Sequence, residues 1–295
     1  MPLSLSRRTF LFTTGGAVLA CAMPALAQTS AETTGPAADL AALERKAGGR
    51  LGVASIDIAS GEKIEYRAQE RFPFCSVFKF VLTGAVLARS QKQPSLLQQK
   101  IYYHKADLVA YSPITQTHVA DGMSVADLCA AAMQYSDNSA ANLLLKLLGG
   151  PAAVTAFARS IGNESFRLDR TETSLNTSIP GDVRDTATPA SMAASLRALA
   201  VDNALSAPAR EQMQTWLRGN TVGTQRIRAA VPAGWRVGDR TGTGEYGATN
   251  DVAVIWRPGM APLLLAIFYT QDQPDAGHKE DVLADATRIV LSALA

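Results

Sequence analysis

The sequence predicts an α/β protein in which a sheet domain, built from both ends of the chain, carries an inserted all-helical domain. Apolar and small residues alternate with period two at 50–60, and strand-like segments return after residue 233. Between about residues 76 and 217, helical patterns follow one another. A chain of 295 residues with 47% hydrophobic residues is ample for a large core. We expect the sheet domain at 28–67 and 219–295, and the helical domain at 68–218.

The first 27 residues are expected to be an export signal. The stretch SRRTFL precedes an apolar run without an acidic residue, and Ala25-Leu26-Ala27 has the small-x-small pattern of a cleavage site. The segment resembles a twin-arginine signal, which implies a periplasmic chain beginning near Gln28. The run is too short and too interrupted to span a bilayer permanently, so no membrane association is expected after processing. Lipoprotein anchoring through Cys21 is the alternative.

The other elements are expected in the following order. A helix at 37–47 precedes the first strand, which turns at Ser60-Gly61-Glu62 into a second strand at 63–69. Helices with capping residues, proline starts or closing glycines are expected at 77–90, 124–134, 139–150, 151–162 and 188–201. Three strands at 234–243, 251–259 and 262–271 are followed by an amphipathic helix at 278–295.

One segment, 170–185, has neither helical nor strand periodicity. It is polar throughout, and its ends, Arg170 and Asp185, carry opposite charges that could clamp it as a compact Ω-loop, a class that is often functional. A surface linker is the alternative interpretation.

Charge and composition exclude several classes of function. Removal of residues 1–27 takes away two of the 28 basic residues and none of the 26 acidic ones, so the mature chain is neutral, which argues against nucleic-acid or anionic-membrane partners. His104, His118 and His278 lie far apart without metal-ligand spacing, and no G-x-S-x-G elbow occurs. Neither zinc hydrolysis nor α/β-hydrolase chemistry is supported.

A serine nucleophile would then need a base other than histidine, and a buried lysine can serve. Ser76 stands where a helix should begin, and Lys79 follows on the same face, near the N–H groups of the helix start. A second S-x-x-K, Ser60 to Lys63, falls in an exposed hairpin turn and is interpreted as a chance match. The phenylalanines around Ser76 predict a partly buried setting that suits an activated lysine.

Further polar motifs follow in a fixed order. Ser136-Asp137-Asn138 leads into a helix, and Glu172 and Asn176 lie within the irregular segment. Each has a plain alternative, helix capping for the first and a solvated loop acid for the second. The stretch VGDRTGTGEYG, 237–247, would alone be interpreted as an exposed turn with a solvated arginine. Together, S-x-x-K, S-D-N, E-x-x-L-N and a cation before T-G resemble the class A serine β-lactamases over essentially the whole mature chain.

The resemblance implies an antiparallel sheet flanked by helices and assigns acylation to four residues. Ser76 would attack the lactam carbonyl, with Lys79 beside it as proton acceptor or relay. Backbone N–H groups of Ser76 and Thr243 would hold the oxyanion, and Ser136 would pass a proton to the departing nitrogen. Whether Lys79 or Glu172 activates the serine stays open.

The resemblance also assigns deacylation and recognition of the acyl side chain. Glu172, with Asn176, would position and deprotonate the water that cleaves the acyl-enzyme. Asn138 would hold the substrate's acylamide group. Glu172 on a clamped loop argues for turnover, because an acylated serine without a positioned water is trapped.

The substrate's carboxylate would be bound by the R-T-G motif. Arg240 stands where the family usually has lysine, a variation found in carbenicillin-hydrolysing members, and it should alter substrate preference. The hydroxyls of Thr241 and Thr243 would line the strand edge, and Gly242 between them would let the substrate approach the backbone closely. Arg226 aligns with a second carboxylate-binding position, and Tyr111 resembles an aromatic wall at the cleft mouth.

We therefore expect a monomeric enzyme that acts on small β-lactams, penicillins and carboxypenicillins first, without metal or organic cofactor. The resemblance implies no disulfide, since the position that pairs with Cys129 in the family holds Thr83 here, and the position that would pair with Cys75 holds Gly244. The second difference weakens a carbapenemase interpretation. Two alternatives remain at this stage, a penicillin-binding transpeptidase or carboxypeptidase and a β-lactam sensor module.

Overall fold

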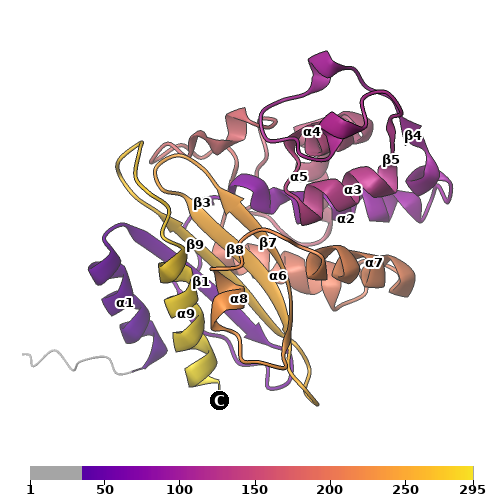
Figure 1. Ribbon diagram of the computed structural model, residues 1–295. Coiled ribbons are helices and arrows are strands. Elements are labelled where there is room, and N and C mark those ends of the chain that lie inside the picture. The colour runs from indigo at the N-terminus through magenta and orange to yellow at the C-terminus, as the bar shows by residue number, and fades with distance from the viewer. Residues whose placement is uncertain (1–34, 295) are drawn as a thin grey trace, which may run out of the picture. The chain divides into compact units, whose positions relative to one another are not determined.

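The computed structural model describes residues 35–294, so the expected export signal lies outside the described residues. A five-stranded antiparallel sheet has the order β2-β1-β9-β8-β7 (Figure 1). Its strands are β1 (Arg50–Asp57), β2 (Glu65–Tyr66), β7 (Arg236–Thr243), β8 (Thr249–Trp256) and β9 (Leu263–Thr270). β1 pairs with β9 along its whole length, from Arg50 opposite Thr270 to Asp57 opposite Leu263. The two ends of the chain therefore share one sheet, as the sequence predicts.

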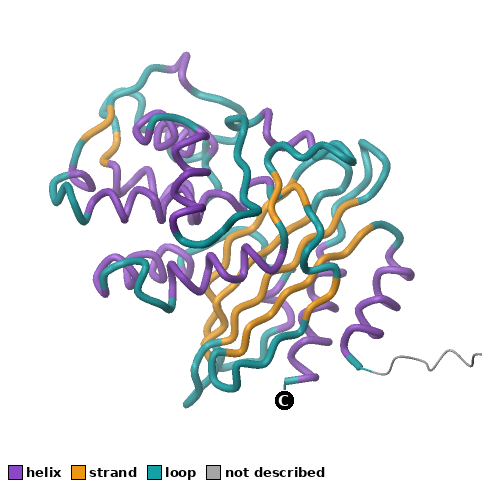
Figure 2. Tube along the Cα trace, turned by 180° about the vertical axis from the view of Figure 1, so that it is seen from behind, coloured by secondary structure: helices purple, strands orange, loops and turns teal. Residues whose placement is uncertain are grey.

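Strand β9 shows why the sheet is covered on both faces. Its eight residues are all buried, and their side chains alternate between two apolar clusters. Leu265 and Ile267 belong to the cluster beneath α1 (Pro36–Ala47) and α9 (Glu280–Ala293). Leu264 and Phe268 belong to the larger cluster that extends into the helical layer. Figure 2 shows the sheet between these two groups of helices.

The helical layer contains α2 (Phe78–Ser90), α3 (Val125–Gln134), α4 (Asn138–Leu148), α5 (Pro151–Ser160) and α7 (Ala207–Arg218). All but α7 were expected with bounds close to these. Helix α6 (Pro189–Ala200) packs on β1, β8 and β9, and so covers the sheet face. The exact boundary between a sheet domain and a helical domain stays a prediction.

Small elements complete the fold. Short 3-10 turns lie at Cys75–Val77, Leu96–Gln98, Lys105–Asp107, Thr115–Thr117 and Ser174–Thr177, and a one-turn helix, α8, at Ile227–Ala230. Two-residue strands pair as β3 (Phe72–Pro73) with β6 (Thr186–Ala187), and as β4 (Lys100–Ile101) with β5 (Met123–Ser124).

The predicted second strand, 63–69, is longer than the observed one. Only Glu65 and Tyr66 pair with β1. Arg67 then adopts a left-handed conformation with φ of 45°, and its guanidinium pairs with Glu44 of α1 at 2.8 Å. The ion pair to a helix on the sheet face thus accompanies the end of the strand.

Strand β7 packs against the turn Cys75–Val77, which carries Ser76 and precedes α2. Gly242 lies at this contact. A Cβ atom there would overlap the Phe74 carbonyl oxygen and lie 3.0 Å from a methyl group of Val77. The glycine of the R-T-G motif therefore allows the strand to approach the turn that holds the serine.

The segment 170–185 is clamped at its ends, as its charges predict. Arg170 Nε lies 2.5 Å from Asp185 Oδ2, and the other oxygen of Asp185 accepts hydrogen bonds from the N–H groups of Asp169 and Arg170. Asp185 is fully buried, so these bonds form away from bulk solvent. We call this segment the Ω-loop.

Cys75 and Cys129 are buried free thiols. Burial raises the pKa of Cys75 to about 12, so its thiol stays protonated near neutral pH. Within residues 35–294, no single helix is both long and apolar enough to cross a membrane.

Candidate active site

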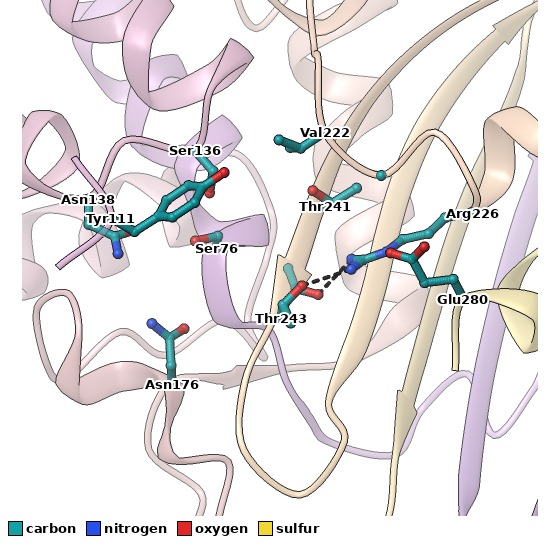
Figure 3. A pocket seen from close by; sticks show the side chains of 12 residues that line it. Ser76, Tyr111, Ser136, Asn138, Asn176, Val222, Arg226, Thr241, Thr243 and Glu280 are labelled. Carbon is teal, nitrogen blue, oxygen red and sulfur yellow. Dashed lines mark hydrogen bonds and ion pairs between the residues drawn. The ribbon is translucent and has the colours of Figure 1, made fainter. Parts of the chain in front are cut away.

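A cavity of about 420 Å³ lies where β7, the Ser76 turn, the start of α4 and the Ω-loop meet (Figure 3). Nine of the predicted site residues line it: Ser76, Tyr111, Ser136, Asn138, Asn176, Arg226, Thr241, Gly242 and Thr243. Three others, Lys79, Glu172 and Arg240, are buried and contact Ser76 or Ser136 from behind the lining. The structure thus brings all twelve predicted residues to one place.

The hydroxyl of Ser76 is held between a donor and an acceptor. Lys79 Nζ donates to Ser76 Oγ at 2.9 Å, and Ser76 Oγ donates to Glu172 Oε1 at 3.0 Å. The serine proton is therefore directed at the carboxylate, and a lone pair of Oγ is held by the ammonium. The sequence-based expectation gave Glu172 the task of positioning a water for deacylation; in the structure its carboxylate also contacts the Ser76 hydroxyl directly.

Lys79 is fully buried in a polar pocket. Besides Ser76, its Nζ lies 2.7 Å from Asn138 Oδ1, 2.9 Å from the Ser136 carbonyl and 2.9 Å from Glu172 Oε1. Burial lowers the pKa of Lys79 to about 8, although the Glu172 carboxylate acts in the opposite direction. The amine is thus mostly charged at neutral pH but can lose its proton at modest cost.

Glu172 is fixed by its neighbours on both its side chain and its backbone. Asn176 Nδ2 donates to Glu172 Oε2 at 2.6 Å, whereas Asn142 of α4 binds the N–H and the carbonyl of Glu172 at 2.9 and 2.8 Å. The Oδ1 atom of Asn176 is buried and has no hydrogen-bond partner among the described residues. It can accept a hydrogen bond from a small polar molecule beside Glu172.

Arg240 is fully buried and does not line the cavity. Its three nitrogens donate to the Ser76 carbonyl at 3.1 Å, the Met133 carbonyl at 3.0 Å and Ser136 Oγ at 2.5 Å. The R-T-G motif was expected to bind the substrate carboxylate; Arg240 lies behind the cavity lining, and its role in binding stays a prediction. The guanidinium spans three acceptors inside the protein, which binds the Ser76 turn to Ser136.

The Arg240 side chain remains a cation in spite of its burial. Desolvation lowers its pKa to about 10, which still leaves it protonated at neutral pH. Its charge acts on the cavity from behind Ser136. Since Ser136 Oγ accepts from Arg240 and lies 3.3 Å from Lys79 Nζ, the Ser136 proton is free to be donated toward the cavity.

Arg226 and Thr243 form the opposite wall. Arg226 Nη2 donates to Thr243 Oγ1 at 2.8 Å, which leaves the threonine proton free to bind an anion in the cavity. Arg226 also pairs with Glu280 Oε1 at 3.1 Å. Glu280 lines the cavity, and sequence reasoning missed it, because its only signal was an acid at the start of the C-terminal helix.

Tyr111 and Asn138 form the outer wall near α4. Tyr111 is 58% exposed and has φ of 59°, and its carbonyl accepts a hydrogen bond from the Asn138 N–H at 3.0 Å. The Asn138 amide binds Lys79 through its oxygen and the Ala110 carbonyl through its nitrogen. One N–H of that amide remains for a ligand.

Two residues support the site from α4: Asn142 was not singled out from the sequence, and Asp137 was named there only as part of the Ser136-Asp137-Asn138 motif. Asn142 lies one turn after Asn138 in α4, and this i,i+4 spacing was a usable signal for a shared face. Asp137 caps α4 through the Ala140 N–H and also binds the N–H groups of Ile114 and Thr115, so it holds the loop beside Tyr111. The oxyanion role of the Ser76 and Thr243 N–H groups stays a prediction.

Within residues 35–294, no group of three or more His, Cys, Asp or Glu side chains is placed to hold a metal ion. The site is instead a serine, a lysine and a carboxylate in mutual contact, with hydroxyl and amide groups around them. This set fits acyl transfer through a serine with proton transfer by lysine and glutamate.

Comparison with known proteins gives the family. A model of the β-lactamase enzyme family matches residues 35–294. β-Lactamase OXY-1 and the carbapenem-hydrolyzing β-lactamase KPC, both of Klebsiella oxytoca, are 53% and 55% identical over 255 residues. The alignments cover 86% of this chain and 88% and 87% of those relatives.

Solved structures agree with this assignment. The β-lactamase from Desulfarculus baarsii has a TM-score of 0.87 and 54% identity, with 88% of this chain and 97% of that chain covered. An ancestral class A β-lactamase has a TM-score of 0.85 and 55% identity, with 88% and 99% covered. The chain therefore belongs to the β-lactamase enzyme family, in its class A, and is a β-lactam hydrolase.

Proposed function

We propose that this enzyme hydrolyses penicillins, carboxypenicillins included, and some cephalosporins through an acyl-enzyme on Ser76, and so confers resistance to them. One observation carries the proposal. The Ser76 hydroxyl donates to Glu172 at 3.0 Å while it accepts from Lys79 at 2.9 Å. This is the arrangement that a serine needs to lose its proton as it attacks a carbonyl.

Acylation then follows from these contacts. Ser76 Oγ bonds to the lactam carbonyl carbon as its proton passes to Glu172, and the C–N bond of the ring breaks. Ser136 gives its proton to the lactam nitrogen and is reprotonated by Lys79, 3.3 Å away. After this step Glu172 carries the serine proton and Lys79 is neutral. The low pKa of Lys79, about 8, makes that donation inexpensive.

Deacylation returns both groups to their starting states. Glu172 can pass its proton to Lys79, since Nζ and Oε1 are 2.9 Å apart. The carboxylate then takes a proton from a water that attacks the acyl carbon, and the ester bond to Ser76 breaks. Asn176 supports this step twice, because Nδ2 binds Glu172 and the unpartnered Oδ1 can accept from the water. The proton on Glu172 returns to Ser76 Oγ.

Binding of the substrate carboxylate is proposed at the wall of Thr241 and Thr243. The Thr243 hydroxyl accepts from Arg226 and can donate into the cavity. Arg240 would favour an anion there through its buried charge, behind Ser136 and without direct contact. We propose Asn138 and Tyr111 as the contacts for the acyl side chain, since both line the outer part of the cavity.

The setting of the enzyme is also a proposal. The arginine pair and cleavage pattern in residues 1–27 support export by the twin-arginine route to the periplasm, with lipoprotein processing at Cys21 as the alternative. We propose that the processed chain is a monomer and leaves the membrane.

Replacing Glu172 tests the mechanism. In Glu172→Gln, we expect deacylation of ampicillin to fall about 10²- to 10⁴-fold, the usual contribution of a general base. Acylation should slow but stay measurable, because Lys79 also contacts Ser76 and can accept its proton. Stopped-flow kinetics and intact-protein mass spectrometry should find the acyl-enzyme accumulating, with the mass of the intact substrate added to Ser76.

Glu164→Gln is the matched control, since that glutamate is 80% exposed at the surface and should leave both steps unchanged. Equal loss of acylation and deacylation in Glu172→Gln would contradict the assigned division of labour. A wild-type enzyme that stalls after one equivalent of ampicillin would contradict turnover itself.

A further inference from the structure

The cavity has one charged end. Of its twelve lining residues, only Arg226 and Glu280 carry charge, and they pair with each other at 3.1 Å. Figure 3 shows the two side chains together beside Thr243, across the cavity from Tyr111 and Asn138. Ser76 lies between these ends, so the pair is separated from the acyl-side wall.

Most N–H groups of the Arg226 guanidinium in this pair donate to acceptors of the protein itself. Arg226 Nη1 donates to the carbonyls of Gly242 and Asn250 at 2.9 and 2.8 Å, Nη2 donates to Thr243, and Nε donates to Glu280. Of the five N–H groups of an arginine, one remains. The Arg226 side chain is only 6% exposed, whereas that of Glu280 is 37% exposed. The charge most accessible to a ligand at this end is therefore the carboxylate.

The proposed binding mode decides which part of a substrate meets this end. With the lactam carbonyl at Ser76 and the ring carboxylate at Thr243, the ring substituent next to that carboxylate points along the same wall. In cephalosporins this is the group at C3. A positive charge on it would lie near Glu280, while a neutral group gains nothing from the carboxylate.

We propose that Glu280 is a specificity-determining residue, which favours β-lactams with a cationic substituent at C3 over otherwise identical neutral ones. The inference rests on the proposed function, because it uses the carboxylate site at Thr243. It differs from a structural role of Glu280 as an acid in the first turn of α9, where it would stabilise the helix and leave substrate preference unchanged.

Cephaloridine and cephalothin provide a matched pair of substrates. They share the thienylacetyl side chain and differ at C3, where the first carries a pyridinium and the second a neutral acetoxy group. The measured quantity is the ratio of their kcat/KM values. Glu280→Gln also releases Arg226 from its partner, but this acts on the ring carboxylate that both compounds share and cancels in the ratio.

We expect the cephaloridine to cephalothin ratio to fall about three- to fivefold in Glu280→Gln, the size typical of a partly exposed ion pair. Glu280→Lys should lower it further. In the wild type, raising NaCl to about 1 M should move the ratio toward that of Glu280→Gln, because the screening length shrinks to roughly 3 Å.

Asp281→Asn is the control variant. Asp281 is the next residue of α9, is exposed and does not line the cavity, and its substitution changes the net charge equally. The cephaloridine to cephalothin ratio of Asp281→Asn should equal that of the wild type. An equal fall in Asp281→Asn and Glu280→Gln, or no fall in either Glu280 variant, would overturn the role of Glu280 and leave the proposed function in place. A wild type that hydrolyses ampicillin but neither cephalosporin would overturn the role of Glu280, whereas a wild type that fails on ampicillin would overturn the proposed function as well.

Discussion

At the scale of single residues, the pH dependence of acylation is set by whether Glu172 or Lys79 accepts the Ser76 proton. Lys79 and Glu172 both contact Ser76, and the two possible bases predict opposite pH profiles. The pKa of Lys79 lies at about 8, below its ordinary 10.5, chiefly because the amine is buried. Lys79 is therefore charged below pH 8 and neutral above it.

We expect kcat/KM for ampicillin to decline above about pH 8 in the wild type. The geometry has charged Lys79 holding Ser76 and supplying the proton to Ser136, so loss of its proton removes both contributions. In Glu172→Gln, Lys79 must act as the base, and the acylation rate should instead rise with pH. The lysine pKa should also be lower there, since the Glu172 carboxylate raises it. A wild-type profile that rises through pH 8 would make neutral Lys79 the base.

At the scale of elements, the site depends on the close packing of one strand against one turn. Strand β7 passes so close to the turn Cys75–Val77 that only glycine fits at 242. Gly238, on the same strand, is also tightly packed, with a Cβ position 3.0 Å from Leu217 Cβ and from Trp256. Position 242 is the tighter of the two, because its Cβ would overlap a backbone oxygen, whereas the nearest atoms at 238 belong to side chains.

Gly242→Ala should lower kcat for ampicillin by more than about tenfold, because the new methyl group must displace the turn that carries Ser76. It should also destabilise the protein by about 1–3 kcal/mol, the usual cost of overpacking. Gly238→Ala is the control, with a smaller stability loss in urea unfolding and little change in kcat. Equal kcat losses in the two variants would mean that the contact at 242 has no special link to the nucleophile.

At the scale of the whole molecule, the sequence predicts the elements and motifs well because they follow local rules. Period-two strands, capped helices and the S-x-x-K, S-D-N and E-x-x-L-N spacings need no knowledge of distant contacts. The Ω-loop clamp was predictable too, since Arg170 and Asp185 have opposite charges at the ends of one segment.

What sequence reasoning missed depends on contacts between distant segments. The burial of Arg240 follows from acceptors at Ser76 and Met133, more than 100 residues away. Glu280 reaches the cavity only because α9 begins beside Arg226. The second strand is shorter than predicted because Arg67 turns toward Glu44, 23 residues earlier. Such pairings are set by tertiary packing, which one-dimensional patterns do not encode.

The two ends of the chain are joined by a buried ion pair as well as by the sheet. Arg257, just after β8, contacts both oxygens of Asp57 at the end of β1, at 3.1 and 2.5 Å, and both side chains are buried. Burial alone would raise the pKa of Asp57, but hydrogen bonds from Arg257 and the Ala59 N–H outweigh it and hold the pKa below its usual value. The carboxylate is thus stabilised by the fold.

Asp57→Asn should lower the free energy of unfolding by about 3–5 kcal/mol at pH 7, because it leaves the Arg257 charge buried without its partner. A group with a depressed pKa contributes stability above its unfolded pKa of about 3.9 and loses it as the pH falls through the folded value. In urea titrations, the difference in the free energy of unfolding between wild type and variant should therefore have its full size at pH 7 and shrink below about pH 4. Since neither residue lines the cavity, kcat for ampicillin at pH 7 should stay unchanged in the folded variant. A gap that persists undiminished in acid would show that the pair stabilises the sheet by packing rather than by charge.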